Sequence, residues 1–144
     1  MPEFILGMNG KMYWGAAGAA LGALTELTNA RDVTVNLEAG EADITTRANS
    51  GWRATAPTLR ECSVDFEMVW KPGDAGFDAL LAAFLTNATI ELAVLDQARE
   101  TSGAQGPKGS FAVTSFSRGE PLEEAMIVPA SVKLSTFDEW VDVA

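Results

Sequence analysis

The acidic residues Asp65 and Glu67 are the pair in this sequence best placed to do chemistry. They alternate along one predicted strand, so both carboxylates project from the same face. Two carboxyl groups held together can act as a general acid and a general base. That role needs a desolvated carboxyl with a raised pKa, and nothing in the flanking sequence indicates burial. We therefore interpret Asp65 and Glu67 as part of a solvated strand face.

Other catalytic and ligand-binding sets are missing from the sequence. The 144 residues include no histidine, which removes the commonest general base and the commonest metal ligand. Phosphate-binding, zinc-binding and nucleophile-elbow motifs are also absent. Glu41 and Asp43 lack the spacing of an EF-hand calcium loop. Cys62 falls in the apolar series of a strand, where a buried, inert thiol is expected. We expect no catalytic residue, cofactor or metal.

Composition indicates one acidic globular domain. Hydrophobic residues make up 47% of the chain, and the net charge is -10. Such a surface repels phosphate, which disfavours a groove that grips nucleic acid but suits a conduit through which DNA slides. The single cysteine excludes an internal disulfide. The apolar segment Met12–Leu24 is too short and too rich in glycine to span a bilayer, so we expect no membrane contact and synthesis in the cytoplasm.

Residues 1–30 are predicted to form an N-terminal arm, separate from a single domain at 31–144. The segment is dense in glycine and alanine, which make a poor core of their own. Leu21, Leu24 and Leu27 would anchor the arm on another surface. The alternative is a short helix that packs on the core of its own subunit.

From residue 31 onward the hydrophobic pattern is that of β-strands. The strongest is Glu61–Trp70, where apolar residues alternate with polar ones five times in succession. Pro129 lies inside another predicted strand, and since proline cannot donate to a central ladder, we expect a bulge or a sheet edge there. The remaining predicted strands are a segment around Val33–Leu37, Thr89–Leu95, Ser110–Ser117 and Ala125–Thr136.

One helix and two long connections complete the predicted domain. The helix spans about 74–87, with Asp74 as its N-cap, Asn87 as its stop, and apolar residues recurring at helical spacing. We expect it to cover one face of the β layer. Gly40–Arg60 is predicted to be a long projecting hairpin that turns at Ala48–Gly51, and Gln97–Gly109 a surface loop.

Trp52 is a candidate interface residue within the predicted hairpin. A large aromatic side chain among arginines on a loop is typical of an interaction hot spot. The alternative is that Trp52 folds back onto the core of its own domain. Charge is also uneven: the hairpin is basic, whereas Glu120–Ala144 is acidic, which favours head-to-tail association of copies. The basic residues of the hairpin are Arg47, Arg53 and Arg60.

Four segments of the chain resemble the tail tube (major tail) proteins of long-tailed bacteriophages. The order of strand, long hairpin with an Asp-x-Thr-x-Arg element, strand, helix and strands matches as well. The resemblance covers roughly residues 25–136. The segments are LTNARDVTVNLEAGEADITTRANSGWRATAPTLRECSVDFEMVW (Leu27–Trp70), GDAGFDALLAAF (Gly73–Phe84), TIELAVLD (Thr89–Asp96) and GSFAVTSFSRGEPLEEAMIVPASVKLS (Gly109–Ser135).

This resemblance implies a mainly β fold with one helix: a small β-sandwich or barrel of the phage tail tube type. It implies self-assembly into hexameric rings that stack into the tube of the virion tail, bridged by the hairpin and the arm. DNA passes through without specific binding, and the other implied partners are a tape measure protein and tail tip and terminator proteins. Arg47, Trp52, Arg53 and Arg60 are then expected between rings, and Asp65 and Glu67 in the lumen.

One alternative within the same class, and two alternatives from other classes, compete with a phage tail tube. A tube subunit of a related contractile or secretion particle would share the fold. A monomeric β-sandwich that binds sugar or protein would need an exposed aromatic platform, for which Trp14, Trp52 and Trp140 are candidates. An enzyme is the weakest class, because no catalytic set is visible.

Overall fold

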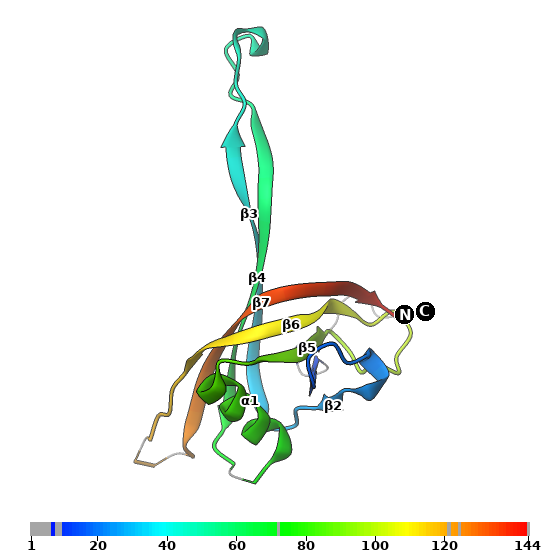
Figure 1. Cartoon of the computed structure of the whole chain (residues 1–144), viewed down its shortest axis with the longest axis vertical. Coiled ribbons are helices and arrows are strands. Elements are labelled where there is room, and N and C mark those ends of the chain that lie inside the picture. Colours follow the sequence, from blue (N-terminus) through cyan, green and yellow to red (C-terminus); the bar gives the residue numbers. More distant parts are fainter. Residues whose placement is uncertain (1–6, 8–9, 72, 121, 124, 144) are drawn as a thin grey trace.

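The described part of the chain folds into one antiparallel sheet with a single α-helix packed on it (Figure 1). This computed structural model describes residues 7, 10–71, 73–120, 122–123 and 125–143. Within them the seven strands run in the order β2-β1-β5-β6-β7-β4-β3. The prediction of a mainly β fold with one helix is confirmed. The elements are β1 (Lys11–Gly15), a 3-10 turn at Leu21–Ala23, β2 (Thr25–Glu26), β3 (Ala30–Asp43), a 3-10 turn at Arg47–Asn49, β4 (Thr55–Val69), α1 (Ala75–Thr86), β5 (Thr89–Leu95), β6 (Gln105–Phe116) and β7 (Ile127–Asp142).

The main core lies between α1 and one face of the sheet. The alternate residues Cys62, Val64, Phe66 and Met68 of β4 are buried there, as the period of two predicted. Phe77 of α1 is 1% exposed. Its ring lies edge-on to those of Trp70 and Phe116, with centroids 4.9 and 5.7 Å away.

Both predicted ends of the helix are confirmed. Asp74 Oδ2 accepts a hydrogen bond of 3.1 Å from the Phe77 amide, as an N-cap does. Asn87 takes the left-handed conformation (φ 56°) that ends a helix. The buried face of the helix is narrower than predicted, because Leu85, which follows the apolar spacing, is 70% exposed.

The sheet is curled, so that its two edges face each other across a groove of about 900 Å³. Val33, Val35 and Leu37 of β3 line one side, and Lys11 and Met12 of β1 line the other. Three register shifts between β6 and β7 mark bulges, which bend strands and increase their twist. The strands therefore form one open, barrel-like sheet in place of two stacked sheets.

Residues 11–30 belong to the domain, which corrects the predicted arm from Lys11 onward. β1 pairs with β5 along its whole length, and β2 pairs with β1. Met12 and Leu27 enter the main core, whereas Tyr13 and Leu24 join a second, smaller cluster on the opposite face of the sheet. The segment thus packs on its own subunit, through strands and a 3-10 turn where the alternative expected a helix. Residues 1–6, 8 and 9 lie outside the described residues.

Two further expectations are wrong in detail. β6 begins at Gln105, inside the predicted loop Gln97–Gly109, because Gly106 lets two strands approach closely: a Cβ there would collide with the backbone of Val94. β7 lies between β6 and β4, so Pro129 is not at a sheet edge, and the β4–β7 register runs through the Glu67–Pro129 pair without a shift, so this ladder has no bulge there. The Pro129 carbonyl accepts a hydrogen bond of 3.0 Å from the Ser117 amide, which lies just past the end of β6. The Pro129 nitrogen lies on the same side of β7, where β6 has already ended, so no ladder hydrogen bond requires it as a donor.

Candidate assembly surfaces

The β3–β4 hairpin extends far beyond the body of the molecule (Figure 1). Its ladder pairs Ala30 with Met68 at the base and Asp43 with Thr55 near the tip. Only the Ser63–Val69 part of β4 also pairs with β7, so the outer part is a two-stranded ribbon. The turn uses left-handed conformations at Ser50 and Gly51 (φ 53° and 85°), within the predicted turn at 48–51.

Side-chain hydrogen bonds fix the shape of the hairpin tip. The Thr45 hydroxyl accepts from the Ala54 amide at 2.7 Å and donates to the Ala54 carbonyl at 3.2 Å. Asp43 Oδ1 accepts from the Thr45 amide at 2.9 Å. Hydrogen bonds from Thr45 hold the pKa of the Asp43 carboxyl below its usual value. The tip therefore has a defined geometry without a core of its own.

Large apolar side chains are exposed along the hairpin. Trp52 is 79% exposed, so the alternative that it folds back onto its own core is wrong. Leu59 is 84% exposed and Ile44 is 55% exposed. The sequence analysis did not single out Leu59 and Ile44 as interface candidates. Each is an isolated apolar residue within a polar stretch, and that pattern could have indicated an exposed contact residue. Exposed apolar groups on a projecting ribbon are typical of a contact with another chain.

The four predicted interface residues do not form one cluster. Arg47 and Arg53 are exposed and flank Trp52 at the tip. Arg60 lies lower on the ribbon, opposite Ala39. The tip thus combines one large aromatic ring with two arginines, and Arg60 belongs to a separate part of the hairpin.

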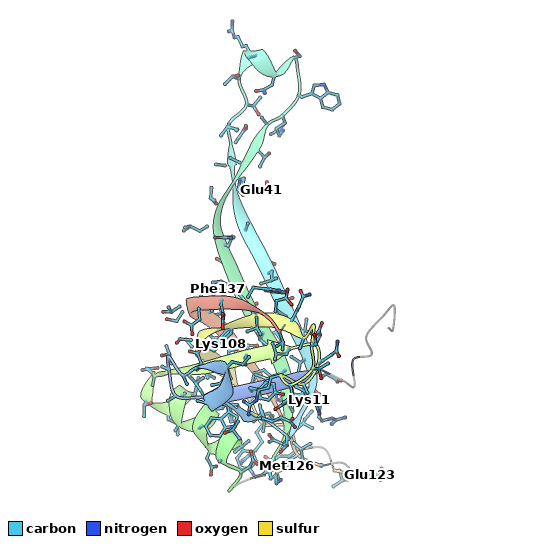
Figure 2. All side chains as sticks on the ribbon, turned by 90° about the vertical axis from the view of Figure 1, so that its right-hand side faces the viewer. Lys11, Glu41, Lys108, Glu123, Met126 and Phe137 are labelled. Atoms are coloured by element: carbon cyan, nitrogen blue, oxygen red, sulfur yellow. The ribbon has the colours of Figure 1, made fainter. Side chains whose placement is uncertain are left out.

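The end of the molecule opposite the hairpin carries acidic and apolar side chains. Figure 2 shows Glu123 and Met126 at this end, with Glu41 on the hairpin above the body. Met126 is 38% exposed and the neighbouring Leu122 is 99% exposed. The Glu120 carboxylate is about half exposed and lies 3.6 Å from Arg118. The two ends therefore differ in their exposed charges: the tip carries Arg47 and Arg53 beside one carboxylate, and the far end carries Glu120 and Glu123 beside one guanidinium.

Asp65 and Glu67 lie on the sheet face opposite the helix, as their alternation with Val64 and Phe66 requires. Asp65 accepts hydrogen bonds from Ser131 at 2.6 Å and from Asn36 at 3.0 Å. Glu67 lies opposite Pro129. The strand alternation and the paired register place five side chains with a strong acidic excess on this face: Asp32, Glu61, Asp65, Glu67 and Lys133.

A second polar cluster is buried where the segment 16–24 covers the same side of the sheet. Lys108 Nζ lies 2.6 Å from Glu91 Oε2 and 2.9 Å from Asp138 Oδ2. Glu91 Oε1 accepts from the Ser110 hydroxyl and the Gly18 amide, at 3.1 and 3.0 Å. Glu91 is 0% exposed and the Lys108 side chain is 5% exposed. The sequence did not predict this cluster, because Lys108 fell in the predicted loop Gln97–Gly109 and its partners come from strands that are distant in sequence.

The neighbours of Lys108 and Asp138 in this cluster shift the pKa values of both groups. Burial pulls the pKa of Lys108 down, but the hydrogen bonds and charges of Glu91 and Asp138 outweigh burial and hold it above its usual value. Hydrogen bonds with Glu91 and Lys108 hold the pKa of Asp138 below its usual value. Lys108 and Asp138 are therefore both charged at neutral pH.

Comparison with known families identifies one matching model, described as phage tail tube protein, over residues 12–135. No curated protein sequence matches the chain significantly. Within the described residues no helix has the length and apolar character needed to cross a membrane, and no three potential metal ligands gather.

Solved tube structures share the fold of this chain at low sequence identity. A protein in the tail of an empty GTA (gene transfer agent) particle with C6 symmetry matches with a TM-score of 0.75 and 17% identity, over 96% of this chain and 98% of that one. The SPP1 tail tube protein matches with a TM-score of 0.73 and 19% identity, over 97% and 81%. A protein of an extracellular contractile injection system, in a sheath–tube complex, matches with a TM-score of 0.58 and 7% identity, over 96% and 90%.

Proposed function

Because this chain belongs to the phage tail tube protein family, we propose that six copies close into a ring and that the rings stack into the DNA conduit of a virion tail. The family supplies the role of tube subunit. The free strand edges, the hairpin and the acidic face of this chain support the finer assignments. The C6 symmetry of the structurally similar GTA tail supports the number six.

Ring closure uses the free edges of the curled sheet. β3 is an edge strand of 14 residues, and its outer backbone groups have no strand partner within the described residues. β7 pairs with β4 only as far as Lys133, which leaves Leu134–Asp142 unpaired on that side of the described sheet. Unpaired strand edges are templates for another strand, and a closed ring removes them.

Ring stacking uses the hairpin. Arg47, Trp52 and Arg53 at the tip of one subunit contact the far end of a subunit in the next ring, near Glu120 and Glu123. Opposite charges then meet, while Trp52 supplies the apolar area that such contacts need. Arg60, lower on the ribbon, contacts the neighbouring ring or a neighbour within the same ring.

The acidic face with Asp65 and Glu67 lines the lumen. Carboxylates repel the DNA backbone, so DNA slides through without specific binding. A tape measure protein fills the lumen before DNA does, and tail tip and terminator proteins cap the two ends. The subunit is made in the host cytoplasm, acts in the virion tail, and works without turnover, as a structural protein.

The alternative of a binding module would need tryptophans that share one exposed surface, and in the described structure the three candidates lie apart. Trp14 of β1 packs against the main core. Trp52 lies at the hairpin tip, and Trp140 of β7 lines the groove between the sheet edges. The tubes of contractile particles share the fold, and a gene for a sheath protein next to this one would favour that alternative.

Negative-stain electron microscopy of the purified protein at high concentration tests the proposal. We expect stacked rings or hollow tubes, either spontaneously or after addition of preformed tail tips as an initiator. A chain that stays monomeric under both conditions would contradict the proposal.

A further inference from the structure

We propose that Lys108 and Asp138 become joined by an amide bond, formed by the folded chain itself with Glu91 as the proton-transfer group. The three side chains come from adjacent strands: Glu91 from β5, Lys108 from β6 and Asp138 from β7. Figure 2 shows Lys108 in the body of the molecule, just below Phe137. This inference concerns one subunit and does not depend on how subunits assemble.

The first observation is proximity under burial. Lys108 Nζ lies 2.9 Å from a carboxylate oxygen of Asp138, and its side chain is 5% exposed. Condensation of an amine with a carboxylate is unfavourable in open water. Holding the two groups in contact replaces a bimolecular encounter and removes the solvent reorganisation that such an encounter needs.

The second observation is a base beside the nucleophile. Only the neutral amine of a lysine is nucleophilic, and Lys108 carries a proton at neutral pH. Glu91 Oε2, at 2.6 Å, is placed to take that proton. The Ser110 hydroxyl and the Gly18 amide hold the other oxygen of Glu91, so its orientation toward Lys108 is fixed.

Two features distinguish Asp138 from Glu91 as the group that is attacked. Asp138 lies at a bulge of β7, where Phe137 pairs with Gly109 and Glu139 pairs with Lys108. A bulge re-aims the extra side chain, here toward Lys108. The Asp138 side chain also keeps 30% of its surface exposed, so the released water can reach the solvent. The Glu91 side chain is 0% exposed.

The reaction balances without any added reagent. The Lys108 ammonium gives one proton to Glu91, and the neutral Nζ then attacks Cγ of Asp138 to form the C–N bond. Glu91 returns that proton to the departing oxygen of Asp138, and the attacking nitrogen supplies a second. The C–O bond breaks and one water leaves. Glu91 ends as it began, and nothing is oxidised or reduced.

Mass spectrometry of the intact, denatured protein tests the proposal. We expect a mass lower than that of the sequence by one water, and a branched peptide that joins Lys108 to Asp138 in the tandem spectrum. Asp138→Asn should reach the same final mass by losing ammonia instead. Lys108→Arg should keep its full mass, which separates the amide from dehydration elsewhere in the chain.

Glu91→Gln tests the proton-transfer role. This variant keeps the shape of the side chain, so we expect a folded protein by circular dichroism with its full, unreduced mass. A wild-type chain at full mass, both freshly purified and after days of incubation, would overturn the proposal. So would a link from Lys108 to Glu91, or a water loss that persists in Lys108→Arg. Loss of water in Glu91→Gln would overturn the role of Glu91.

Discussion

Arg53 lies across the hairpin tip from Asp43, with Nη1 4.0 Å from Oδ2, and their side chains are 83% and 62% exposed. An exposed pair at this distance contributes little to stability. Asp43 is also engaged by Thr45, through a hydrogen bond of 2.9 Å. The Arg53 guanidinium therefore stays available for a carboxylate on another chain.

Reversing the charge of the tip, in Arg47→Glu with Arg53→Glu, is expected to block stacking of rings without unfolding the subunit. Both side chains are exposed, and surface substitutions of this kind usually change the free energy of unfolding by about 0.5 kcal/mol or less. Tube length by negative stain and thermal unfolding by circular dichroism are the readouts. Arg47→Lys with Arg53→Lys is the matched control and should form tubes. Normal tubes from the charge-reversed variant would contradict the role of the tip.

The acidic end gives a second, complementary prediction. Glu120→Arg with Glu123→Arg should weaken stacking alone, and should restore it when combined with the reversed tip, because the charges then match again. The readout is tube yield for the four combinations at low and at high salt, which screens exposed charges. If the combined variant stays as defective as either parent, the two surfaces do not meet.

Trp52→Ala should reduce stacking while leaving the fold intact. The ring is 79% exposed in the subunit, so little apolar area is lost from the folded monomer. Fluorescence offers a direct check, because burial of Trp52 on assembly should shift its emission to the blue. Comparison with the Trp52→Phe variant, which keeps an apolar ring, isolates the contribution of ring size. No change in tube yield for Trp52→Ala would argue against an anchor at this position.

The lumen assignment predicts size-selective protection. In assembled tubes, the thiol of a Glu67→Cys variant should react with a small maleimide. It should not react with a maleimide attached to a bulky polymer, because that polymer cannot diffuse along the lumen. A cysteine at Asp78, exposed on α1, should react with both. The native thiol of Cys62 is buried, and burial raises its pKa, so its background reactivity is low. Equal labelling of both positions by the bulky reagent would place Glu67 outside the lumen.

Arg99 is expected to hold the segment 16–24 against the sheet. Its guanidinium donates to the carbonyls of Leu21 and Leu24, and its backbone amide donates to the Tyr13 hydroxyl. Arg99→Ala should therefore increase hydrogen exchange in this segment and leave α1 protected. Arg118→Ala, which removes a guanidinium stacked on Trp70 at the other side of the molecule, is the control and should not affect this segment. Unchanged exchange in Arg99→Ala would mean that packing alone holds the segment.

Local patterns predicted the elements that local physics determines. The helix ends followed from Asp74 and Asn87, and the buried series of β4 followed from strict alternation. The hairpin and its turn followed from the glycine and polar residues between two strands. These features depend on neighbours within a few residues, so a single sequence carries them.

Features that depend on distant neighbours escaped prediction. The Lys108 cluster needs three strands that meet only in the folded sheet, and Gly106 is required by the backbone of Val94. Leu24 and Leu27 looked like anchors for another surface because their partners lie far away in sequence, on the chain's own sheet. Pairing within the sheet overrode the weak local signal of the Gly/Ala-rich segment.

A helical cryo-EM reconstruction of the assembled tube would locate the hairpin and the acidic face within the assembly. The proposed assembly requires that each β3–β4 hairpin crosses to the next ring, with Trp52 buried near Glu120 and Glu123, and that Asp65 and Glu67 face the lumen. Hairpins that end free in solvent, or those carboxylates on the outer wall, would contradict it.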